Sequence, residues 1–138
     1  MKVSDYVNSF LKKNEVKFIF EMSGGMITHL LDSIYQKNEI KIVSMKHEQS
    51  AAFAADTVGR LTGKPGIAMA TSGPGATNLI TGIGSSYFDS SPTVFITGQV
   101  NRNELKKNRK IRQLGFQETD IVSIIKPITK KAFRASNA

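Results

Sequence analysis

The chain has 138 residues and a net charge of +8, with 40% hydrophobic and 22% charged residues, which indicates one globular domain and not a disordered segment. It contains no cysteine, which excludes a disulfide framework and cysteine-based metal sites. No apolar run approaches the roughly 18 residues that span a bilayer, and no signal peptide is recognisable at the beginning, so we expect a cytoplasmic protein with no membrane partner.

Apolar periodicity and turn residues predict helices that alternate with strands. Ser4 is expected to cap a first helix, whose apolar positions recur at helical spacing. The Gly24–Gly25 pair ends the first strand, and an amphipathic helix follows it. The predicted elements are helices at 4–11, 27–35, 47–61, 76–87 and 119–125, and strands at 18–20, 40–45, 66–70, 93–97 and 132–134.

This alternation predicts an α/β fold, a parallel sheet flanked by helices on both faces. No linker or repeat divides the chain, so residues 1–138 are expected to form a single domain. Ligands of such sheets bind beyond the carboxyl ends of the strands. Those ends carry the segments 21–25, 45–48, 71–75 and 97–99.

Glu48 is the most unusual residue at these strand ends, because it opens an Ala-rich helix. A structural interpretation is a first-turn carboxylate that favours the helix dipole by about 0.3–1 kcal/mol. His47 beside it is more typical of a packing residue than of a base. The 71–75 turn lacks the spacing of a phosphate-binding loop, and its proline removes one amide donor, so we interpret it as a tight turn.

Basic residues are concentrated in the segment 102–112, which holds six of them against one acid. A second basic cluster lies at 126–134. Such charge can indicate an anionic partner. However, no aromatic residue is interleaved in the 102–112 segment for base stacking, and no nucleic-acid-binding motif is present. We therefore interpret the segment as a solvated loop and expect no nucleic-acid partner.

Six short motifs, in their order and spacing, resemble the N-terminal, pyrimidine-binding domain of thiamine-diphosphate-dependent enzymes, and most closely the acetolactate synthase branch. The resemblance covers nearly the whole chain. The motifs are HEQSAAFAA at 47–55, GKPG at 63–66, ATSGPGATNL at 70–79, ITGQV at 96–100, FQETD at 116–120 and PITK at 127–130.

The resemblance implies roles for individual residues. Glu48 matches the carboxylate that activates the cofactor through a hydrogen bond to N1′ of its pyrimidine ring, acting as a proton relay. Gln117 matches a glutamine that reaches the reacting centre, so the catalytic candidates are Glu48 and Gln117. Phe53 matches a bulky residue facing the same region, although helix packing explains it equally well. The cofactor-binding candidates are Gly24, Gly25, Glu48, Thr71 and Asn78.

The implied activity is decarboxylation of a 2-keto acid such as pyruvate and transfer of the product to an acceptor carbonyl, by a homodimer or tetramer. Helices 47–61 and 76–87, with Gly82 and Gly84, have the small residues that suit close packing between subunits. In the family, Mg²⁺ and the diphosphate are held by another domain. We therefore expect no metal ligands in this chain, an incomplete pyrimidine domain without the central and diphosphate-binding domains, and no activity from the chain alone.

Two departures from the family pattern leave the substrate open. Ser23 stands where the family often has proline, and the loop 101–115 is longer and more basic than in typical acetolactate synthases. One alternative is a thiamine-diphosphate enzyme of a sugar or surface-polysaccharide pathway. Another is a non-catalytic interaction module that retains the fold. The chain itself is expected to be a fragment or, alternatively, one subunit of a two-chain enzyme.

Overall fold

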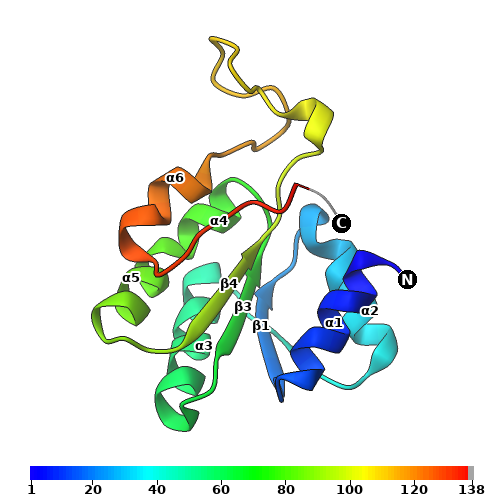
Figure 1. The fold of residues 1–138 in the computed structure, drawn as a ribbon, viewed down its shortest axis with the longest axis vertical. Coiled ribbons are helices and arrows are strands. Elements are labelled where there is room, and N and C mark those ends of the chain that lie inside the picture. Colours follow the sequence, from blue (N-terminus) through cyan, green and yellow to red (C-terminus); the bar gives the residue numbers. More distant parts are fainter. Residues whose placement is uncertain (137–138) are drawn as a thin grey trace.

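The computed structural model describes residues 1–136. Its four strands form one parallel sheet in the order β2-β1-β3-β4, with helices on both sides (Figure 1). The predicted α/β fold is therefore confirmed. The strands are β1 Phe18–Met22, β2 Lys41–Ser44, β3 Gly66–Ala70 and β4 Thr93–Thr97. The α-helices are α1 Val3–Lys13, α2 Thr28–Lys37, α3 Glu48–Thr62, α4 Pro74–Asn78, α5 Ile80–Phe88 and α6 Ile121–Ile125, and 3₁₀ turns lie at Gly25–Ile27, Arg102–Glu104 and Lys126–Ile128.

Alternate side chains of the strands enter two separate cores. On β3, Ile67 and Met69 face the core that α1 and α2 cover, whereas Ala68 and Ala70 face α3 and α5. The second core is built largely from small residues, which let its helices approach the sheet closely. A Cβ atom placed on Gly66 would lie only 1.9 Å from the carbonyl oxygen of Ala55. Both faces of the central strand β3 are thus buried, as expected for a parallel sheet covered on both sides, whereas the edge strands β2 and β4 are more exposed.

The small residues of α3 and α5 are used within the chain. A Cβ atom on Gly82 would lie 2.3 Å from the Cβ of Ala52, and Gly84 is also buried. Gly82 and Ala52 therefore bring α5 against α3 within the chain. The close packing of these helices between subunits stays a prediction.

Three local predictions are wrong. Ser4 lies inside α1, and Lys2 is the residue that precedes the helix, in extended conformation and without a side-chain cap. The helix predicted at 76–87 is divided at Leu79, whose N–H bonds to the carbonyl of Ala76, so that α4 and α5 are separate. Residues 132–134 form no strand, since no neighbouring strand pairs with them, and Phe133 is 72% exposed.

A long segment leaves the sheet after β4 and projects beyond the body of the molecule before it returns at α6 (Figure 1, yellow to orange). The segment is irregular apart from the 3₁₀ turn at Arg102–Glu104, which agrees with the loop predicted there from the sequence. Within residues 1–136, no helix combines the length and the apolar character needed to cross a membrane.

Candidate functional site

Glu48 lies at the beginning of α3, directly after the carboxyl end of β2. Its neighbour His47 is the N-cap of the helix, and the Nδ1 atom of His47 accepts a hydrogen bond of 3.1 Å from the backbone N–H of Gln49. This bond satisfies one of the free N–H groups of the first turn. His47 therefore has a structural role here, and it fixes the place at which the Glu48 side chain leaves the helix.

The carboxylate of Glu48 is held by Asn78, the last residue of α4. Asn78 Nδ2 donates to Glu48 Oε2 at 2.9 Å. Gly75, in the first turn of α4, lies on the other side of the carboxylate, because a Cβ atom there would be 3.4 Å from Glu48 Oε1. Glu48 is partly buried and Asn78 is exposed, so the pair lies at the surface end of the sheet.

Thr71 connects this pair to the turn that follows β1. A Cβ atom on Gly24 would lie 2.4 Å from the Cβ of Thr71, and a Cβ atom on Gly75 would lie 2.8 Å from its Cγ2. The backbone N–H of Met26 also donates to Thr71 Oγ1 at 3.4 Å. Only glycine fits at these two positions without displacement of the threonine. Gly25, in contrast, faces open space.

Gln117 joins the same region from the far end of the projecting loop. Gln117 and Gly73 both have positive φ angles, of 61° and 60°. A Cβ atom on Gly73 would lie 2.6 Å from the Cβ of Gln117, so Gln117 packs on the turn between β3 and α4. The structure thus brings Glu48, Asn78, Thr71, Gly24 and Gln117 together at one edge of the sheet, with no direct bond from Gln117 to Glu48.

Phe53 is separate from both cores. It is 39% exposed on α3 and belongs to neither buried cluster. Ordinary core packing therefore does not account for this side chain.

Sequence reasoning missed Glu21, which is only 1% exposed although it carries a carboxylate. Its two oxygens accept hydrogen bonds from the hydroxyls of Ser23, at 2.8 Å, and Ser44, at 2.5 Å. A depression of about 350 Å³, also lined by Gly24 and Thr28, lies beside it. The carboxylate connects the end of β2 with the turn that contains Gly24. The sequence signal was a charged residue directly after the apolar run 18–20, at the predicted carboxyl end of the first strand.

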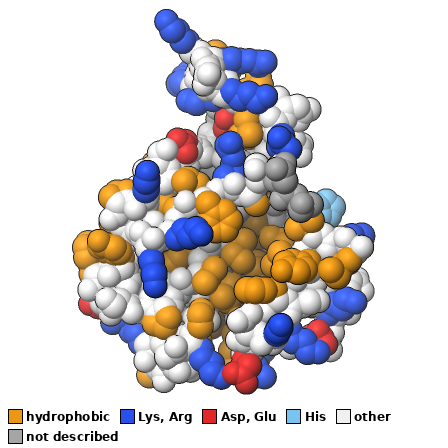
Figure 2. Space-filling model, in the orientation of Figure 1, with side chains coloured by type: hydrophobic (Ala, Val, Ile, Leu, Met, Phe, Trp, Pro, Cys, Tyr) orange, Lys and Arg blue, Asp and Glu red, His pale blue; other side chains and the backbone are white. Residues whose placement is uncertain are grey.

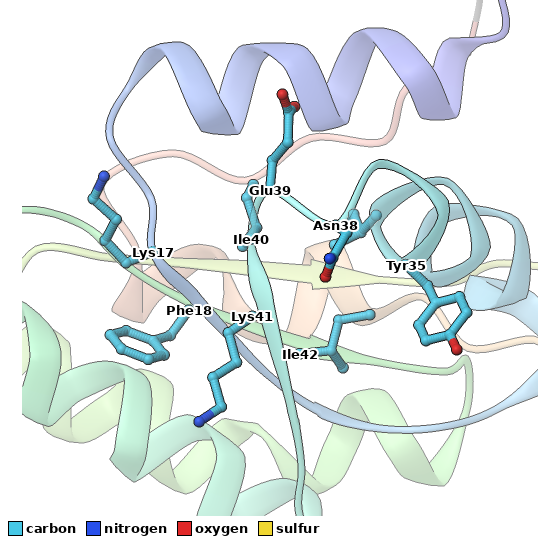
Figure 3. Close-up of a pocket in the computed structure, with 9 residues that line it drawn as sticks. Lys17, Phe18, Tyr35, Asn38, Glu39, Ile40, Lys41 and Ile42 are labelled. Atoms are coloured by element: carbon cyan, nitrogen blue, oxygen red, sulfur yellow. The ribbon is translucent and has the colours of Figure 1, made fainter.

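A larger depression, of about 600 Å³, lies at the outer edge of β2 (Figure 3). Lys17, Phe18, Lys41 and Ile42 line it at the beginnings of β1 and β2. In parallel sheets ligands bind at the opposite, carboxyl ends of the strands. We therefore place the candidate site at Glu48 and not in this depression.

The hydrogen-bonding groups at the candidate site suit a neutral heteroaromatic ring. They comprise one carboxylate that accepts, two carboxamides that donate and accept, and one threonine hydroxyl, beside glycines that pack on Thr71. The hydroxyl of Ser72 is buried in the adjoining turn and has no partner within residues 1–136. No basic side chain belongs to the set, so the site fits an aminopyrimidine better than a phosphate. Within residues 1–136, no group of three or more acids and histidines could hold a metal ion.

The model of a known protein family matches residues 1–124, and its description is thiamine pyrophosphate enzyme, N-terminal TPP binding domain. The chain belongs to this family. The resemblance predicted from the sequence motifs is therefore confirmed, and thiamine diphosphate is the cofactor that the family binds.

Curated relatives support the same assignment. The chain is 46% identical to an acetolactate synthase of Arthrospira platensis over 126 residues, 89% of this chain and 21% of the relative. It is 40% identical to a probable acetolactate synthase large subunit of Methanocaldococcus jannaschii over 134 residues, 97% of this chain and 22% of the relative. A large subunit from Haemophilus influenzae is 38% identical over 135 residues, 98% of this chain and 22% of the relative. The chain spans about a fifth of the length of these relatives.

Proposed function

We propose that this chain is the part of an acetolactate synthase-like carboligase that binds the aminopyrimidine ring of thiamine diphosphate. The observation that carries the proposal is the position of Glu48, whose carboxylate is oriented by Asn78 at the carboxyl edge of the sheet. Gly24 and Gly75 beside it carry no side chains and pack closely against Thr71, so the turns that hold these residues meet next to the carboxylate. The similarity to acetolactate synthases supports the choice of reaction class.

Each site residue has a role in this proposal. Glu48 hydrogen-bonds the N1′ atom of the ring and passes a proton to and from it, as general acid–base catalysis requires. Asn78 is a positioning residue, since its amide holds Oε2 and leaves Oε1 turned toward Gly75. Thr71, Gly24 and Gly25 form the side of the site that lies next to the turn after β1. Gln117 reaches toward the reacting centre from the Gly73 turn.

When bound, thiamine diphosphate supplies a carbon nucleophile and an electron sink for the decarboxylation of a 2-keto acid such as pyruvate. We propose that Mg²⁺ and the diphosphate are held by a domain outside this chain, in keeping with the division of the cofactor that the resemblance to the family implies. We further propose a homodimer or tetramer as the active assembly. On this view the chain alone is inactive and binds the cofactor weakly.

The first experiment titrates the chain with thiamine diphosphate and Mg²⁺ by calorimetry. The expected result is no binding in the micromolar range, since most of the cofactor is left without protein contacts. Micromolar binding would contradict the proposed division of the cofactor between domains.

The second experiment measures carboligation of pyruvate by the complete enzyme that contains this chain. The expected result is formation of a carbon–carbon bond that depends on thiamine diphosphate and on Glu48. Cofactor binding without any turnover of 2-keto acids would favour the non-catalytic interaction module. Turnover only with a sugar-derived acceptor would favour the sugar or surface-polysaccharide pathway, an alternative that the unusually basic loop 102–112 supports.

A further inference from the structure

The projecting loop carries an isolated group of positive charges. We define the cationic arm as residues 105–115; it includes Lys107, Arg109, Lys110 and Arg112, all exposed. The arm contains no acidic residue, and none of these four side chains forms an ion pair with an acid within residues 1–136. Figure 2 shows blue side chains gathered on this projection, with few red ones near them. The arm therefore presents unpaired positive charge at the tip of a narrow extension.

One carboxylate fixes both ends of the arm. Glu118 accepts a hydrogen bond of 2.7 Å from the backbone N–H of Lys106 and one of 2.8 Å from that of Leu114. The N–H of Gly115 donates to the carbonyl of Glu104 at 2.8 Å, which closes the base further. The hydrogen bond from Leu114 is the main reason that the pKa of Glu118 lies below its ordinary value. The carboxylate thus stays ionised, and the arm stays closed at its base, at neutral pH.

The base of the arm adjoins the candidate site. Gln117, next to the clamping residue Glu118, packs on Gly73 in the turn before α4. The carboxamide of Gln99, just after β4, donates to the carbonyl of Thr119 at 2.7 Å. Both connections lie at the carboxyl edge of the sheet, where Thr71 and Glu48 also lie. The base of the arm therefore lies beside the candidate site, while the arm itself projects beyond the body of the molecule (Figure 1).

We propose that the cationic arm binds the phosphate groups of a phosphorylated acceptor substrate of the adjacent site. The assignment of this ligand as a substrate rests on the proposed function, whereas the phosphate affinity of the arm does not. Guanidinium and ammonium groups are the side chains that form charge-assisted hydrogen bonds with phosphate oxygens. Two arginines and two lysines lie within six consecutive residues, 107–112, which suits a compact anion with two phosphates.

Two other kinds of partner fit the arm less well. Binding of single-stranded nucleic acid usually adds aromatic side chains on which bases stack, and residues 105–115 contain no aromatic residue. A second copy of the chain would need an acidic surface, but several of its acids are already paired internally. These are Glu15 with Lys64, Glu39 with Lys12, and Asp56 and Asp89 with Arg60.

The test measures binding of inorganic pyrophosphate to the whole chain by calorimetry, and locates it by backbone NMR shifts. The arm variant is K107A/R109A/K110A/R112A. The matched control is K126A/K130A/K131A/R134A, which removes the same number of positive charges from the second basic cluster. We expect pyrophosphate to shift the signals of residues 106–114 and to bind about tenfold or more weakly to the arm variant, with less than about a threefold change in the control.

Several results would overturn the proposal. Equal weakening in both variants would mean that only net charge matters, and the absence of any binding at low salt would remove the site altogether. Tighter binding of a single-stranded DNA oligonucleotide than of pyrophosphate, lost in the arm variant, would assign the arm to nucleic acid. Thiamine diphosphate that shifts the arm and Glu48 together would assign the arm to the cofactor. A failure of carboligation in the complete enzyme, with pyrophosphate binding intact, would contradict the proposed function and leave the arm as a phosphate site.

Discussion

Asn78 donates a hydrogen bond to Glu48 over 2.9 Å, and this contact joins the end of α4 to the beginning of α3. The two residues are 30 positions apart in the sequence, so only the parallel arrangement of β2 and β3 brings them together. The bond occupies Oε2, and no residue within 1–136 forms a hydrogen bond to Oε1. One oxygen of the carboxylate is therefore oriented while the other is left for a ligand.

Replacing Glu48 with glutamine in the complete enzyme separates catalysis from structure. Glutamine keeps the shape and the contact with Asn78, but it cannot relay a proton. We expect exchange of the cofactor C2 proton with deuterium to slow by about 10²–10⁴-fold, while thermal stability changes by about 1 kcal/mol or less. Asn78→Ala should slow exchange less, because the carboxylate remains. Exchange at the wild-type rate in the glutamine variant would show that Glu48 is only a helix residue.

Alanine at Gly24 should destabilise the chain, and alanine at Gly25 should not. The new Cβ at position 24 would lie 2.4 Å from the Cβ of Thr71, which cannot rotate away. Overpacking of this kind costs about 1–3 kcal/mol. At position 25 the added methyl group meets open space, so we expect a change within about 0.5 kcal/mol. Urea unfolding of the two variants is the measurement, and equal free energies of unfolding would contradict the contact with Thr71.

The buried carboxylate of Glu21 should make its two serine partners important for stability. Ser23→Ala and Ser44→Ala each leave one oxygen of Glu21 without its hydroxyl donor, and an unsatisfied buried group costs about 1–3 kcal/mol. Replacing Glu21 with methionine in the S23A/S44A background should recover much of that loss, since the whole polar cluster is then removed. Chemical denaturation compares the wild type with the two single variants, with S23A/S44A and with the triple variant. A triple variant that is less stable than S23A/S44A would contradict this prediction. It would mean that the Glu21 side chain stabilises the fold even without its two serine donors.

Asp56 should make stability depend on pH in the acid range. Burial opposes ionisation of this residue, but hydrogen bonds from Arg60 and Ser86 outweigh burial and hold its pKa below 3.8. Because the pKa is lower in the folded chain than in the unfolded one, ionised Asp56 stabilises the fold above about pH 4, and this contribution is lost as pH falls through the folded pKa.

The measurement is the difference in free energy of unfolding between wild type and Asp56→Asn. We expect it to be constant near neutral pH and to shrink below about pH 4, and Ser86→Ala should reduce the pH dependence. A difference that stays constant down to about pH 2 would contradict the role of the ionised carboxylate.

Exposed apolar side chains on α3 and α5 should cause the chain to self-associate. Leu61 is 82% exposed and Phe88 is 77% exposed, and these two helices pack against each other. Exposed apolar side chains favour association where they form a contiguous surface. Sedimentation at about tens of micromolar is expected to find dimers, and Phe88→Asp should shift them to monomers. Tyr35→Asp is the matched control, because Tyr35 is 74% exposed but lies on α2, across the sheet. A monomer at every concentration would refute the prediction.

Apolar periodicity was enough to predict most helices and strands of the fold. It did not predict contacts between residues that are far apart in the sequence. The strands could be predicted because burial on both faces demands continuous apolar runs. The assignment of 132–134 as a strand failed because a strand exists only with a partner, and the local sequence does not show one. Glu21 was missed because Ser44, which holds it, is 23 positions away. His47 was not recognised as a cap because caps are usually smaller polar residues.

The candidate site was predictable in its location and less so in its details. The rule that ligands bind at the carboxyl ends of parallel strands places Gly24, Glu48 and Thr71 together. The role of each residue came from the resemblance to a family, and it stays a prediction. The bond between Asn78 and Glu48, and the packing of Gln117 on Gly73, could not be read from spacing, because both depend on how separate turns meet in space.

The two hydrogen bonds that Glu118 accepts from the backbone close the base of the cationic arm. They separate the arm from the body of the domain, so that the two parts can vary independently. Since Glu118 binds only the backbone of Lys106 and Leu114, the seven residues from 107 to 113 can change in length or charge without altering either bond. Substitutions there leave the two cores and the Glu48–Asn78 pair untouched. The backbone bonds of Glu118 to Lys106 and Leu114 therefore mark boundaries at which a loop from another family member could be grafted onto this domain.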